Sequence, residues 1–101
     1  MNAKVLQESR LETDCLGSLE IPAAALFGIN TARGVANLAV SGRSIGSERQ
    51  FVRAFAQCKE AAALANRDLG VITEAQCGAI VAACRELAGG LHDDSMVIDL
   101  M

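Results

Sequence analysis

Few side chains in this sequence could carry out acid–base or metal chemistry, and the densest group of them is His92, Asp93 and Asp94. An imidazole beside two carboxylates can bind a metal ion or share a proton. Adjacent residues on a loop do not converge on one point, however, and the chain has no second histidine. We expect a solvated group at a helix end, where His92 interacts with the helix dipole or donates to the last carbonyls. The sequence therefore predicts no catalytic residue and no metal ligand.

The cysteines and glycines offer no alternative site. Cys15, Cys58, Cys77 and Cys84 form none of the closely spaced pairs typical of metal sites. Cys77 and Cys84 lie about two helical turns apart, which is too far for an easy disulfide. We predict that all four are reduced, small core residues. Because no glycine-rich phosphate loop or nucleophile elbow is present, no cofactor is expected either.

Composition limits the class of protein. The chain has 101 residues, of which 51% are hydrophobic and 3% aromatic, and a net charge of -3. These values indicate one compact domain with an aliphatic core, helped by a partner surface. We expect no nucleic-acid partner, because the arginines form no basic stripe, and no membrane partner, because no apolar run approaches about 18 residues. The first ten residues lack the apolar stretch of a signal peptide, so the predicted location is the cytoplasm.

The first half of the chain reads as an extended pair followed by an interrupted helix. Residues 1–9 are expected to be flexible, and residues 10–22 alternate in polarity around a Gly17-Ser18 turn. Pro22 suits a first helical position, so a helix is predicted to begin there. This helix, over 23–38, should be broken or kinked at Gly28 and Gly34. Residues 41–46 are predicted to be a loop.

The second half reads as a helical hairpin. Ser47 with Gln50 and Thr73 with Gln76 have the spacing of capping boxes, which predicts helices over 48–69 and 74–88. Gly70 stands where a left-handed residue ends a helix. The first helix carries a predicted inward stripe of Phe51, Phe55, Cys58, Ala62, Ala65 and Leu69. The second carries a stripe of Cys77, Ile80, Val81, Cys84, Leu87 and Leu91. With a tail over 92–101, the predicted fold is mainly α, with a short extended pair, a broken first helix and an αα-hairpin.

Four motifs in order resemble the start of an aspartase/fumarase superfamily subunit. They are R-x-E-x-D-x-L-G at Arg10, Glu12, Asp14, Leu16 and Gly17, I-P at Ile21 and Pro22, G-x-x-T-x-R-x-x-x-N at Gly28, Thr31, Arg33 and Asn37, and K-x-A-A-A-x-A-N at Lys59–Asn66. The likeness covers nearly the whole chain. Ala65-Asn66 and Val40-Ser41-Gly42 make it more similar to aspartate ammonia-lyases than to fumarases, although Phe27 and Asn30 stand where the most similar aspartases have Tyr and His.

The resemblance implies that residues 1–101 are the amino-terminal domain of a homotetrameric enzyme that converts aspartate to fumarate and ammonia. It also implies that the family's substrate loop, Thr-His pair and serine base follow later than Met101, so this chain alone should be inactive. Arg33 is the one residue expected to bind a substrate carboxylate, because its planar fork suits that group. A structural ion pair is the other role open to Arg33.

One rival hypothesis comes from a different class of protein. The chain could be a free-standing helical interaction module that binds a partner through Phe51/Phe55 and Ile80/Leu87. The partners expected under the lyase hypothesis are the remainder of the subunit or a second copy of the chain.

Overall fold

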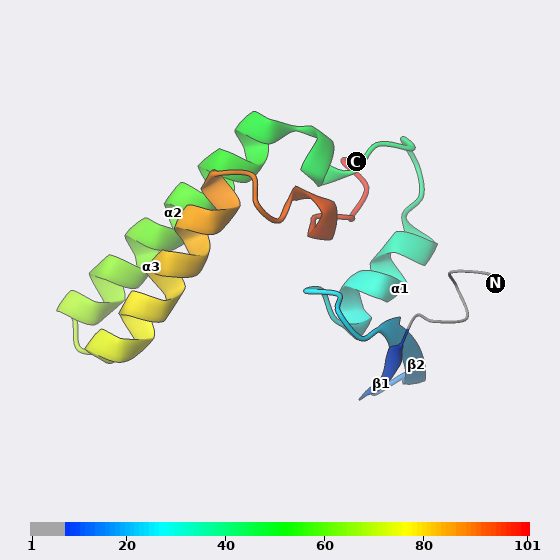
Figure 1. Ribbon diagram of the computed structural model, residues 1–101, viewed down its shortest axis with the longest axis horizontal. Coiled ribbons are helices and arrows are strands. Elements are labelled where there is room, and N and C mark those ends of the chain that lie inside the picture. Colours follow the sequence, from blue (N-terminus) through cyan, green and yellow to red (C-terminus); the bar gives the residue numbers. More distant parts are fainter. Residues whose placement is uncertain (1–7) are drawn as a thin grey trace. The chain divides into compact units, whose positions relative to one another are not determined.

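The computed structural model describes residues 8–101 and divides into two compact units. One unit runs to Ser44 and includes Ser95–Met101, and the other is Ile45–Asp94. The first contains strands β1 (Ser9–Asp14) and β2 (Gly17–Pro22) and helix α1 (Ile29–Asn37), and the second contains helices α2 (Arg49–Asp68) and α3 (Glu74–Ala88), as Figure 1 shows. Short 3-10 helices occupy Ile45–Ser47 and Asp93–Ser95. The predicted fold class, mainly α with an extended pair and an αα-hairpin, is confirmed.

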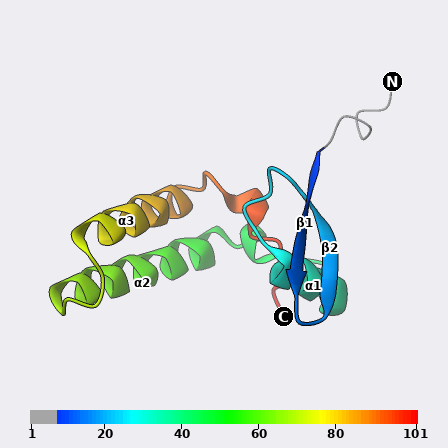
Figure 2. The ribbon, with the colours of Figure 1, turned by 90° about the horizontal axis from the view of Figure 1, so that it is seen from below.

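The two strands form an antiparallel hairpin whose turn residues are Cys15 and Leu16 (Figure 2). The predicted turn at Gly17-Ser18 is wrong, because both residues are paired in β2, where Gly17 has a φ of 123° that suits a glycine. Ser9 pairs with Pro22, so the strand pair begins one residue earlier than predicted. Glu8, also in the predicted flexible segment, accepts a hydrogen bond from the Ala23 amide (2.9 Å), and residues 1–7 lie outside the described residues. Along β1 the polar side chains of Arg10, Glu12 and Asp14 are half-buried, whereas Leu11 is 68% exposed. The inner face of this strand is therefore the charged one.

Helix α1 does not begin at Pro22. Pro22 is the last residue of β2, and its carbonyl accepts a hydrogen bond from the Ala25 amide (3.0 Å) in a turn. The helix begins only at Ile29, with Gly28 at the N-cap position. Gly34 lies inside α1 and does not end it. The prediction failed because strand pairing took Pro22 into the sheet edge, where a missing amide is tolerated.

Helices α2 and α3 lie side by side and antiparallel (Figures 1 and 2). The stripe predicted for α2 is wrong: Phe51, Phe55 and Leu69 are 49%, 42% and 77% exposed. The fully buried positions on α2 are instead Val52, Ala56 and Ala63. Their small side chains let α3 approach closely. The α3 stripe is right at Cys77 and Cys84, which are buried, and wrong at Ile80 and Leu91, which are 40% and 69% exposed.

The ends of the helical hairpin are fixed by specific caps. Thr73 accepts from the Gln76 amide (3.0 Å) and Gln76 Oε1 accepts from the Thr73 amide (2.9 Å), so the second predicted capping box is confirmed. Gly70 adopts a φ of 75°, as predicted. The Ser47 box is wrong, because Glu48 occupies the N-cap and provides no side-chain cap.

Arg49, in the first turn of α2, holds the far end of α3. It donates to the carbonyls of Leu87 (2.9 Å) and Ala88 (2.8 Å) and forms an ion pair with Asp93. A cation at these terminal carbonyls also interacts favourably with the helix dipole.

All four cysteines are free, as predicted. Cys77 and Cys84 are core residues, and burial raises the pKa of the Cys84 thiol above its ordinary value. Cys15 and Cys58 are exposed, so the expectation of a core position was wrong for these two.

Candidate functional site

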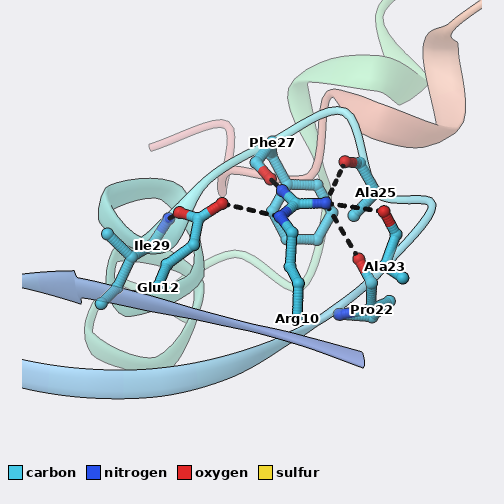
Figure 3. Close-up of polar contacts among 7 residues, drawn as sticks. All are labelled: Arg10, Glu12, Pro22, Ala23, Ala25, Phe27 and Ile29. Atoms are coloured by element: carbon cyan, nitrogen blue, oxygen red, sulfur yellow. Dashed lines mark hydrogen bonds and ion pairs between the residues drawn. The ribbon is translucent and has the colours of Figure 1, made fainter. Parts of the chain in front are cut away.

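Arg10 organises the loop between β2 and α1 (Figure 3). Its guanidinium donates to four backbone carbonyls on that loop and, through Nε, to Glu12 Oε2 (2.8 Å). The carbonyls belong to Pro22 (3.2 Å), Ala23 (2.9 Å), Ala25 (2.9 Å) and Phe27 (2.8 Å). Such a set requires the several fixed N–H donors of a guanidinium. Arg10 therefore sets the path of the chain from the sheet to α1.

Glu12 connects Arg10 to the start of α1. One carboxylate oxygen accepts from Arg10, and the other, Oε1, accepts from the Ile29 amide at 2.8 Å (Figure 3). Glu12 thereby caps the first amide of α1, which Gly28 at the N-cap position cannot do because it has no side chain. A Cβ at Gly28 would lie 3.1 Å from Oε1, so glycine suits this approach. Hydrogen bonds from Arg10 and the Ile29 amide lower the pKa of Glu12.

Asp14 and Arg33 form the next contact along the same face. Arg33 donates through Nε (2.9 Å) and Nη2 (3.0 Å) to the two oxygens of Asp14, and its side chain is 23% exposed. The bond from Arg33 lowers the pKa of Asp14. The structure thus places Arg33 in the structural ion pair that the sequence left open. Substrate binding by Arg33 stays a prediction.

Together, the three acidic and basic residues of the first motif have a positioning role. Arg10, Glu12 and Asp14 occupy alternate positions of β1, so their side chains share one face of the strand. Both carboxylates are paired with arginines and have lowered pKa values, which makes them weak bases. The sequence identified these residues as a motif, but only the structure shows that they fasten the hairpin to the loop and to α1.

The group at residues 92–94 does not form a site. His92 Nε2 lies 2.7 Å from Glu86 Oε1, Asp93 pairs with Arg49, and Asp94 is exposed. The role predicted for His92 at the last carbonyls of α3 is filled by Arg49 instead. Among residues 8–101, no three His, Cys, Asp or Glu side chains are grouped to hold a metal ion.

A shallow hollow of about 190 Å³ lies in the first unit. Its walls come from the end of α1, the loop that follows, and the C-terminal segment. The lining residues are Val35, Ala39, Gly42, Arg43, Ser44, Val97 and Asp99. No spacing in the sequence indicates this hollow, because residues 35–44 and 97–99 are distant along the chain.

Comparisons with known proteins agree with one another. No family model matches the chain. It is 44% identical over 94 residues to fumarate hydratase class II of Halobacterium salinarum, covering 93% of this chain and 20% of that protein. It is 43% identical over 93 residues to aspartate ammonia-lyase of Pseudomonas aeruginosa, covering 92% of this chain and 20% of that protein.

Solved structures give the same result. A fumarate lyase:delta crystallin from Brucella melitensis matches with a TM-score of 0.85 and 41% identity, over 91% of this chain and 20% of that one. A class II fumarase from Schistosoma mansoni matches with a TM-score of 0.80 and 35% identity, over 90% of this chain and 19% of that one.

The chain therefore spans about a fifth of the length of the relatives it matches. Fumarate hydratases and aspartate ammonia-lyases match at nearly equal identity, 44% and 43%, so identity does not separate the two enzymes. The order of the hairpin, α1 and the α2–α3 pair is shared with the solved lyases over nine-tenths of the chain. The chain belongs to the aspartase/fumarase superfamily, as an amino-terminal domain of its lyase subunits.

Proposed function

We propose that this chain is the structural amino-terminal domain of an aspartate ammonia-lyase-like enzyme, whose complete subunit converts aspartate to fumarate and ammonia. The observation that carries this proposal is the match over more than 90% of the chain to about 20% of lyases of both kinds. The leaning toward aspartate rests on the sequence features at Val40–Gly42 and Ala65-Asn66. The free-standing module is not favoured, because the likeness extends over both units of the chain.

The elimination needs a base that removes a proton next to a carboxylate, and donors that stabilise the resulting doubly charged intermediate. In the first unit, the carboxylates of Glu12 and Asp14 are engaged by arginines and backbone amides. The residues of this chain therefore contribute rigidity: Arg10 and Glu12 fix the loop before α1, and Asp14 fixes Arg33. In a complete subunit, a substrate carboxylate would be contacted by the other N–H groups of Arg33, on Nη1 and the second hydrogen of Nη2, because Nε and one Nη2 hydrogen are bonded to Asp14.

We expect the purified chain to produce no fumarate from aspartate. The physical reason is that its described carboxylates are paired or exposed without a donor array to stabilise the intermediate. The ultraviolet absorbance of fumarate follows the reaction directly, and the aspartate ammonia-lyase of Pseudomonas aeruginosa serves as the positive control. Turnover above the blank would contradict the proposal and would direct the search for a base to His92, Asp93 and Asp94.

The proposed partners are the remainder of a lyase subunit or a second copy of this chain, within a homotetramer in the complete enzyme, in the cytoplasm. Apolar surface supports a protein partner. Phe51 and Phe55 stack with ring centroids 6.3 Å apart on the outer side of α2, and Lys59 Nζ lies 5.3 Å from the Phe55 centroid. None of the helices in residues 8–101 combines the length and the apolar character that a membrane span requires.

For the isolated chain we predict self-association at high micromolar concentration, because this aromatic face is left uncovered. Phe55→Glu should weaken the association, since it places a charge in the contact. Gln57→Glu is the matched control: it adds the same charge at an exposed position on α2, away from the Phe51/Phe55 side. Sedimentation equilibrium measures both. A monomer across this range, or equal weakening by the two variants, would exclude association through this face.

A further inference from the structure

Within the first unit, the side chain of Asp99 joins the C-terminal segment to the loop that follows α1. Its Oδ2 accepts hydrogen bonds from the backbone amides of Val40 (3.0 Å), Ser41 (2.8 Å) and Gly42 (3.2 Å). Its Oδ1 accepts from Ser41 Oγ (2.9 Å) and from the Met101 amide (2.8 Å). One carboxylate thus satisfies donors on two segments about 58 residues apart in sequence.

Main-chain contacts align the two segments but are few. The Leu100 amide donates to the Arg43 carbonyl (2.8 Å), and Ser44 and Asp99 form an isolated antiparallel bridge. A single bridge does not make a sheet, and an isolated strand pair is marginally stable in water.

Packing on α1 gives a third point of attachment. A Cβ built at Gly34 would lie 2.7 Å from Ile98 Cδ1, so Ile98 occupies the space that a side chain at position 34 would fill. Glycine inside a helix is unfavourable relative to alanine. The close approach of Ile98 explains why a glycine stands at position 34.

We infer that Asp99 is a latch: its carboxylate holds residues 97–101 and the loop at residues 40–42 together as one structural element, and its loss releases both. This inference does not depend on the proposed function. The same segment lines the hollow described above, where Val97 and Asp99 lie with Val35 and Ala39 among the lining residues.

The latch is constitutive at neutral pH. The Met101 amide, followed by Ser41 and Gly42, lowers the pKa of Asp99 to about 2. The ordinary value is about 3.9, so the carboxylate's contribution is fully present above pH 4 and is lost as the pH falls through about 2. The other charged group at this hollow is Arg43.

Amide hydrogen exchange tests the latch. In Asp99→Ala we expect exchange at the amides of Val40, Ser41, Gly42 and Met101 to accelerate by about tenfold or more, with α3 amides unchanged. Asp99→Asn should give a smaller increase, because it keeps one acceptor oxygen. Asp94→Ala removes an exposed carboxylate from the other unit and is the matched control.

Trypsin provides an independent readout. Release of the latch frees the Arg43 carbonyl from Leu100, so cleavage after Arg43 should become faster in Asp99→Ala than in the unsubstituted chain. If Asp99→Ala does not fold, Asp99→Asn and Ser41→Ala give the same comparison. Unchanged exchange at residues 40–42 in a folded variant, together with unchanged cleavage after Arg43, would overturn the inference.

Discussion

Ala56→Glu should unfold the α2–α3 hairpin. Ala56 is 0% exposed, and with Val52 and Ala63 it forms the buried row of α2. A glutamate there would bury a charge without a partner and would force the helices apart, with an expected loss of more than about 3 kcal/mol in the free energy of unfolding. Thermal unfolding followed by helical circular dichroism measures the loss.

Ala62→Glu on the same helix is the matched control. Ala62 belongs to the stripe that the sequence alone places inward, but the structure leaves it exposed. We expect a change within about 0.5 kcal/mol, as for surface substitutions in general. If Ala62→Glu were the damaging variant and Ala56→Glu the tolerated one, the observed orientation of α2 would be wrong.

The second large effect is expected for Arg10→Ala. In the described part of the first unit, only Ile21 and Ile29 are buried apolar residues, at 1% and 7% exposure. The polar contacts of Arg10 therefore contribute much of the stability of this unit. Removing its bonds to four carbonyls and to Glu12 should destabilise the unit by about 3 kcal/mol, since hydrogen bonds to charged groups are worth about 1.5–3 kcal/mol each and are partly replaced by water.

Amide exchange at Ile29 and along α1 reports this loss separately from α2 and α3. Arg10→Lys keeps the charge but not the fork of donors, so it should fall between the unsubstituted chain and Arg10→Ala. Exchange in α1 that is the same in all three proteins would show that the loop holds its path without Arg10.

Acid should weaken the same contacts. Glu12 and Asp14 both have pKa values lowered by their arginines. Carboxylates of this kind contribute stability above their unfolded-state pKa, and the contribution is lost as the pH falls through the folded-state value. The amides of α1 should therefore lose protection from hydrogen exchange as the pH falls below the ordinary carboxyl range, and exchange measured across a pH series checks this.

The sequence by itself determined the local features of this protein. Thr73 with Gln76 predicted a capping box, Gly70 a left-handed helix end, and the alternating polarity of residues 10–22 an extended pair, because each depends on groups within a few residues of one another. The ordered motifs also predicted the superfamily, and the relatives confirm it.

Tertiary structure decided which surfaces are covered and what the charged motif does. Two apolar rows run along α2, and helical periodicity cannot say which one meets α3; the small row with Ala56 and Ala63 does, because it allows closer packing than Phe51 and Phe55. The roles of Arg10 and Asp99 likewise depend on carbonyls and amides brought together from distant positions. Spacing along the chain reveals side chains that share a face, whereas partners across the fold exist only once the backbone has placed them.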